Sequence, residues 1–130
     1  MEMKQFSILV KDRVGELARV TEALAERAIN IVAIASETSR EKPMIHIVTE
    51  DQDSARKALE KSGREFKEQE ILVVKMLDRP GELAKVARKL AREGINVESI
   101  YLFGKTRGHT EFALAVDDVK SAKKVLDIRD

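Results

Sequence analysis

Two short turns in the sequence offer the groups that a small zwitterion needs. Asp12 stands three residues before Gly15, and Asp78 stands three residues before Gly81. A glycine lets the backbone come close to a ligand because it has no Cβ. The amide groups that open a following helix attract a carboxylate, and the aspartate can accept hydrogen bonds from an ammonium group. Each turn can therefore hold the charged groups of a free amino acid.

The candidate ligand-binding residues lie in these turns and at the start of the next apolar segment. The backbone N–H groups after each glycine are donors, and an asparagine farther along offers both a donor and an acceptor. The predicted residues are Asp12, Gly15, Glu16, Leu17 and Asn30 in the first copy, and Asp78, Pro80, Gly81, Glu82, Leu83 and Asn96 in the second. Pro80 fixes φ and preorganises the second turn, which makes that turn the first choice if only one site functions.

Structural roles are open alternatives for the same residues. Asp12 and Asp78 can cap the helices that follow them, a role that does not exclude ligand contact. The two glycines can serve turn geometry alone. Asn30 can close the preceding helix in the left-handed conformation, a role that Gly94 can fill ahead of Asn96.

The turns occur twice because the sequence contains an internal repeat. Residues 12–31 read DRVGELARVTEALAERAINI and residues 78–97 read DRPGELAKVARKLAREGINV, with 11 of 20 positions identical. Self-similarity at a fixed period indicates repeated structural units. We therefore predict two domains, residues 1–70 and residues 71–130.

Each copy has the pattern of strand, helix, two strands and a second helix. In the first helix of the first copy, Leu17, Val20 and Leu24 recur at helical spacing, which leaves Glu16 and Arg19 on the outer face. The predicted strands are 6–10, 31–35, 44–49 and 66–70, then 71–77, 97–103 and 110–116. The other predicted helices are a short one capped within 51–54, one carrying Leu83, Val86 and Leu90, and 120–126.

The order of these elements predicts an α+β fold. It consists of two tandem ferredoxin-like βαββαβ units with antiparallel sheets and both helices on one face of each. The chain ends shortly after the last predicted helix, so we predict that the second unit lacks its last strand. An open sheet edge is usually covered or used for pairing, here with the other unit or a second chain.

The run D-R-x-G-E-L-A, followed by a helix and I-N-[IV], resembles the ACT domain family. It occurs at Asp12–Ala18 with Ile29–Ile31, and again at Asp78–Ala84 with Ile95–Val97. The resemblance covers nearly the whole chain, and stand-alone tandem ACT proteins without a catalytic domain are similar in length and order. It implies a regulatory protein that senses an amino acid or another small metabolite, often between paired domains, with this turn and this asparagine at the ligand. Many members carry asparagine in place of Asp12 and Asp78.

Composition argues against several other classes. Lys and Arg number 24 and Asp and Glu 23, so the net charge of +1 provides no field for nucleic acid. There is no cysteine, and neither His46 nor His109 has a carboxylate or histidine at metal-ligand spacing. No apolar stretch is long enough to span a membrane. We expect a cytoplasmic, non-catalytic protein without cofactor or metal.

These expectations combine into one leading function and two alternatives. The leading function is a regulatory sensor that binds a free amino acid, in a homo-oligomer such as a dimer. The first alternative is a regulatory subunit that docks on an amino-acid biosynthetic enzyme. The second is a structural pairing module with a vestigial pocket.

Overall fold

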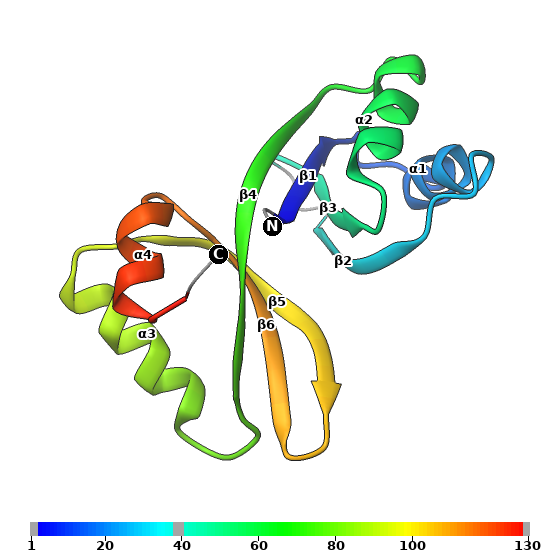
Figure 1. The fold of residues 1–130 in the computed structure, drawn as a ribbon. Coiled ribbons are helices and arrows are strands. Elements are labelled where there is room, and N and C mark those ends of the chain that lie inside the picture. Colours follow the sequence, from blue (N-terminus) through cyan, green and yellow to red (C-terminus); the bar gives the residue numbers. More distant parts are fainter. Residues whose placement is uncertain (1–2, 38–40, 129–130) are drawn as a thin grey trace. The chain divides into compact units, whose positions relative to one another are not determined.

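The computed structural model describes residues 3–37 and 41–128, which form two compact α+β units (Figure 1). One unit holds Lys4–Gln69, and the other begins at Glu70. The elements of the first are β1 (Met3–Leu9), α1 (Glu16–Ala25), β2 (Ile31–Glu37), β3 (Met44–Thr49), α2 (Gln52–Lys61) and the start of β4 (Phe66–Leu77). The second contains the rest of β4, then α3 (Glu82–Arg92), β5 (Val97–Thr106), β6 (His109–Val116) and α4 (Val119–Val125).

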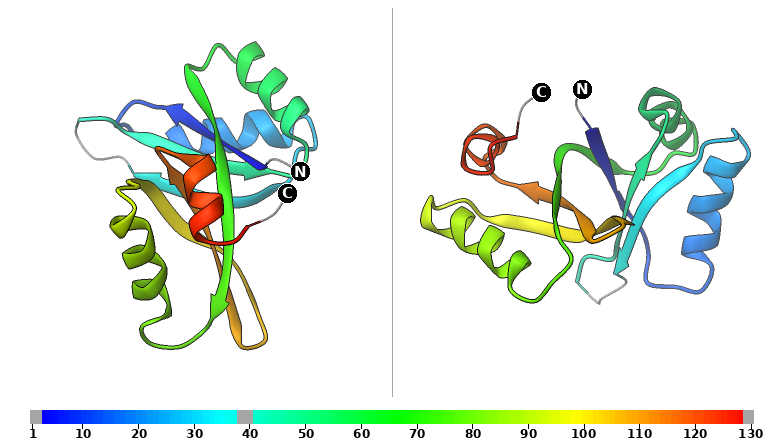
Figure 2. Two further views of the ribbon diagram at one scale, coloured as in Figure 1. Left: turned by 60° about the vertical axis from the view of Figure 1, so that its left-hand side comes forward. Right: turned by 60° about the horizontal axis from the view of Figure 1, so that its bottom comes forward.

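The sheets have the predicted antiparallel ferredoxin-like topology. The strand order is β2-β3-β1-β4 in the first unit and β4-β6-β5 in the second. The pairs β1–β3, β2–β3, β4–β6 and β5–β6 are antiparallel. In each unit the two helices lie together on one face of its sheet (Figures 1 and 2). The predicted fold class is confirmed.

The predicted strands 66–70 and 71–77 form one continuous strand, β4. Neither Gly nor Pro interrupts the sequence between Phe66 and Leu77, so nothing forces a turn there. The prediction of two separate strands was wrong on this point. In the described residues up to Ile128 no strand follows α4, as predicted for the second unit.

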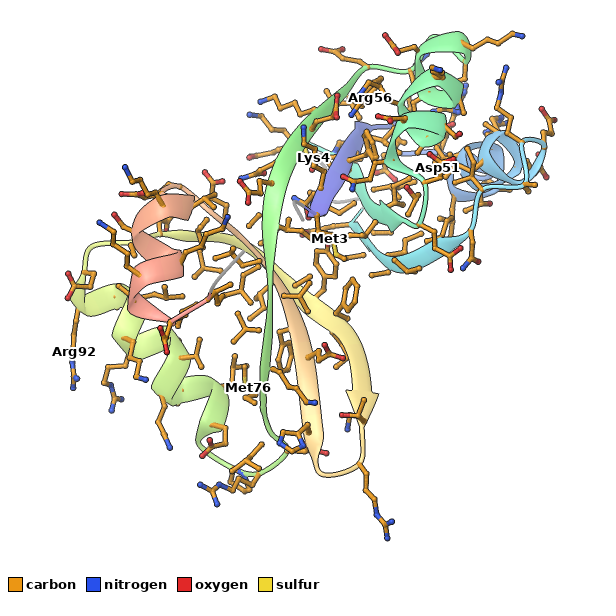
Figure 3. All side chains as sticks on the ribbon, in the orientation of Figure 1. Met3, Lys4, Asp51, Arg56, Met76 and Arg92 are labelled. Carbon is orange, nitrogen blue, oxygen red and sulfur yellow. The ribbon has the colours of Figure 1, made fainter. Side chains whose placement is uncertain are left out.

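Each unit buries its own apolar core between sheet and helices. In the first, Phe6 and Leu24 are fully buried, and the Phe6 ring packs edge-on against Phe66 with centroids 5.9 Å apart. In the second, Leu90 is fully buried in a cluster that includes Met76. Figure 3 shows Met76 on β4, on the side where α3 lies. None of the described helices is both long and apolar enough to span a membrane.

The two units close their first helices with different residues at the same left-handed position. Ala28 has φ 56° after α1, and Gly94 has φ 71° after α3. Ala28 therefore takes the role that was considered for Asn30, and that alternative was wrong. An alanine in this conformation costs about 1–2 kcal/mol because its Cβ crowds the backbone.

Exchanging these two residues should change stability in opposite directions. Ala28→Gly should raise the free energy of unfolding by about 1 kcal/mol, because glycine adopts a positive φ without strain. Gly94→Ala should lower it by about the same amount. Apart from Gly94 and its chain neighbours, no atom in the described part of the chain lies within 4 Å of a Cβ built there, so the effect is conformational. Urea denaturation measures both, and a lower midpoint for Ala28→Gly would contradict this account.

Candidate functional site

Both candidate turns lead into a helix through a glycine in the left-handed region. Gly15 has φ 91° at the N-cap of α1, and Gly81 has φ 87° at the N-cap of α3. Residues with a side chain rarely adopt this conformation, so the turn geometry itself requires glycine. Neither helix has a side-chain hydrogen bond at its cap. The alternative in which Asp12 and Asp78 cap the helices was therefore wrong.

Each asparagine lies at the opposite end of its helix from the turn. Asn30 donates from Nδ2 to Glu50 Oε1 at 3.0 Å, and the Asn96 backbone N–H donates to Asp117 Oδ1 at 2.9 Å. Since α3 has 11 residues, roughly 16 Å separate its two ends. The structure therefore does not bring an asparagine to the turn of its own unit.

Glu16 was predicted on the outer face of its helix, and this prediction was wrong. Its side chain is only 3% exposed. Lys11 N–H donates to Oε1 at 2.8 Å, and Arg64 Nη1 lies 3.4 Å from the same oxygen. The Lys11 amide, with help from Arg64 and Arg13 and against burial, lowers the pKa of Glu16 to about 2. Helical periodicity did not reveal this because the partners that permit burial lie outside the helix.

The first turn is covered by one of the chain's own side chains. Arg19 Nη1 lies 3.3 Å from Glu16 Oε2 and donates to the Val14 carbonyl at 3.3 Å. The same nitrogen would be 3.1 Å from a Cβ on Gly15. Asp12 is exposed, as is about half of Leu17. The guanidinium group therefore takes the space in which a ligand would approach this glycine.

The second turn has no such cover. Beyond Gly81, its chain neighbours and its own helix backbone, no atom of the described residues lies within 4 Å of a Cβ built on this glycine. Lys85 occupies the place of Arg19 in the repeat, but its Nζ lies 3.3 Å from Glu82 Oε2. Arg79 Nε lies 3.0 Å from the same oxygen, and its hydrogen bond lowers the pKa of Glu82. The two turns thus share a backbone conformation and differ in access.

A hollow of about 320 Å³ lies beside the second turn. It has an apolar wall and a charged rim, and it is lined by Met76, Leu77, Asp78, Arg79, Glu82, Leu83, Leu102, Lys105, Thr110 and Phe112. Of the residues predicted from sequence in this unit, Asp78, Glu82 and Leu83 line it. Pro80 and Gly81 belong to the turn beside it, and Asn96 lies at the far end of α3.

Two lining residues were missed by the sequence reasoning. Lys105 Nζ lies 3.5 Å from Asp78 Oδ2, and both side chains are more than half exposed. Thr110 is 5% exposed, and its Oγ1 has no hydrogen-bond partner among the described residues. Thr110 pairs with Met76 in the sheet. In the first unit Val10 corresponds to Met76, and its N–H donates to the carbonyl of Pro43, so a proline corresponds to Thr110. This difference between the repeats was the available signal.

A family model for the ACT domain matches residues 4–61 and again residues 71–129. Together the two matches cover most of the chain. The chain belongs to the ACT domain family. The resemblance inferred from the duplicated turn is thereby confirmed, and the two units of the fold are tandem ACT domains. A comparison with curated protein sequences finds no match.

Several solved structures share this tandem ACT fold. Protein BT0572 from Bacteroides thetaiotaomicron is 28% identical, with a TM-score of 0.84 over 98% of this chain and 88% of its own. The ligand-free regulatory subunit of aspartate kinase from Thermus thermophilus is 23% identical, with a TM-score of 0.69 over 97% and 91%. Its counterpart from Thermus flavus is 21% identical, with a TM-score of 0.73 over 98% and 90%. Because the two regulatory subunits are only 23% and 21% identical to this chain, their similarity supports a shared fold and no shared role.

Proposed function

We propose that this tandem ACT protein is a non-catalytic regulator that binds a free amino acid at the turn of its second domain. The observation that carries the proposal is the hollow beside Gly81, which brings together an uncapped helix start, a carboxylate and a buried hydroxyl without a partner. The first turn has the same backbone, but the Arg19 guanidinium covers it. One site per chain is therefore the expected stoichiometry.

The groups at this turn complement an α-amino acid. Gly81 has no side chain with which to cap α3, so no N-cap side chain accepts from the amide groups of Leu83 and Ala84, which suit a carboxylate. Asp78 can accept from the ammonium group, and Lys105 provides a cation for the carboxylate in addition to the helix amides. Leu83 and Leu102, each partly exposed, offer apolar surface to the ligand side chain. The amino-acid regulatory role of the family points to the same class of ligand.

Thermal denaturation with each of the twenty amino acids tests this proposal. A ligand present at 100 times its Kd should add about 2.7 kcal/mol to the free energy of unfolding. Asp78→Ala should raise the Kd by about 10- to 100-fold, because a charge-assisted hydrogen bond is lost. Asp12→Ala is the matched variant in the other repeat and should leave the Kd unchanged. Binding that survives Asp78→Ala and is lost in Asp12→Ala would place the site in the first domain and refute the assignment.

A separate regulatory subunit of an enzyme is the second candidate. The two aspartate kinase regulatory subunits share the fold of this chain along about nine tenths of their own length, and this correspondence favours the candidate. Co-purification of the tagged chain from its own cells would identify an enzyme partner. A homodimer and a cytoplasmic location stay predictions.

A further inference from the structure

The side chain of Thr110 is the one polar group of the hollow that is both buried and without a hydrogen-bond partner in the described residues. It stands on β6, opposite Met76 on β4 and Lys105 on β5. Leaving a buried hydroxyl unpaired costs about 1–3 kcal/mol. Thr110 is one of the residues that line the hollow, and rotation about its χ1 can turn the hydroxyl towards a group that enters.

The charged and uncharged polar groups of the hollow differ in depth. The side chains of Asp78 and Lys105 are 52% and 59% exposed, and Thr110 is 5% exposed. Glu82 is 14% exposed, and its carboxylate is already paired with Arg79 and Lys85. Met76 and the half-buried Phe112 lie beside Thr110 in the sheet. A zwitterion that binds its ammonium and carboxylate groups at the rim therefore directs its side chain inward, towards an apolar wall that carries one hydroxyl.

This arrangement selects among amino-acid side chains. A charged side chain next to Met76 and Phe112 would lose its hydration. The charged residues that line the hollow already pair with Lys85 or with one another, so none of them is a free counter-ion that compensates the loss. An aliphatic side chain would leave the Thr110 hydroxyl unpaired. A hydroxyl or carboxamide side chain can donate to it or accept from it, because a threonine hydroxyl does both.

We propose that Thr110 is the specificity-determining residue of the second domain, and that it selects amino acids with an uncharged hydrogen-bonding side chain. This inference rests on the proposed function, because it concerns the same site. Pro43 stands at the corresponding place of the first domain and has no side-chain hydrogen-bonding group. The two domains therefore differ at two positions of the candidate site. Pro43 corresponds to Thr110, and Arg19, which covers the first turn, corresponds to Lys85.

Isosteric pairs of free amino acids test the assignment. Calorimetric titration of the wild-type chain should give a Kd about tenfold lower for threonine than for valine, or for asparagine than for leucine, as one neutral hydrogen bond predicts. Thr110→Val keeps the size of the side chain and should abolish this preference within the pair. Thr110→Ser should retain it.

The outcomes separate this inference from the proposed function. Equal Kd values within every pair for the wild-type chain would overturn the role of Thr110 while leaving amino-acid binding intact. A preference that persists in a folded Thr110→Val variant would also overturn it. If that variant does not fold, the wild-type pairs and Thr110→Ser still decide. No binding of any of the twenty amino acids would refute both proposals together.

Discussion

Replacing Glu16 by glutamine should lower the melting temperature at pH 7 by about 5–10 °C. The carboxylate accepts from the Lys11 amide, and Arg13, Arg19 and Arg64 lie within 3.4 Å of its oxygens. Glutamine has almost the same shape but no charge. It therefore leaves the guanidinium groups without their counter-ion, and it turns an NH₂ group towards cations in a site where the side chain is only 3% exposed.

The same variant should change the pH dependence of stability. The folded pKa of Glu16 is about 2 and its ordinary value is 4.5. Because the folded value is lower, the stabilisation is fully present above pH 4.5 and is lost as the pH falls from 4.5 towards 2. Thermal melts of wild type and Glu16→Gln between pH 7 and pH 2.5 measure this. The difference between their melting temperatures should shrink on the acid side.

Glu82→Gln is the matched control, because Glu82 occupies the same place in the second repeat. Its side chain is 14% exposed and contacts only Arg79 and Lys85 among the residues for which ion pairs are described. At pH 7, Glu82→Gln should lower the melting temperature less than Glu16→Gln does. The other carboxylates are common to wild type and Glu16→Gln. If both proteins lose the same free energy of unfolding between pH 7 and pH 3, Glu16 does not titrate as described.

The arrangement of helices and strands could be predicted because it follows from local sequence. The predicted strand 44–49 coincides with β3, where β-branched residues lie between a proline and an acidic turn. Asp51 caps α2 by accepting from the Ser54 amide at 3.0 Å, as its residue type predicts. The continuity of β4 could not be predicted from local sequence, because the start of the second copy of the repeat suggests a boundary between two strands. Only the pairing of β4 with a strand on each side shows that it runs without a break from Phe66 to Leu77.

The candidate site was predictable only in part. The turn at Asp78 could be predicted because aspartate and glycine favour turns through local backbone interactions. Lys105 and Thr110 lie about thirty residues away, and only the sheet register brings them to that turn. The cover over Gly15 depends on the direction of one arginine side chain, which is held by the buried carboxylate of Glu16. Such contacts between distant residues carry no periodic signal in a single sequence.

Leu24→Ala and Leu90→Ala should each cause a large loss of stability. The two leucines occupy the same place in the two repeats, and both are fully buried. Removing the side chain of either should cost about 3–5 kcal/mol, from the lost transfer free energy and the cavity left behind. Urea denaturation followed by circular dichroism measures the free energy of unfolding of each variant.

The two losses need not be equal, because the cores around the two leucines differ. The first contains Phe6 packed against Phe66, and rings held edge-on can shift little to fill a cavity. The second is built from aliphatic and methionine side chains together with a partly buried Phe112, and methionine adapts more readily to a gap. Leu24→Ala should therefore cost more than Leu90→Ala. Leu17→Ala, at a side chain that is 48% exposed, is the control and should cost about 1 kcal/mol. A loss at Leu90 no greater than that of the control would mean that α3 does not bury its apolar face, and the hollow at its first turn would then have no rigid wall on which to bind a ligand.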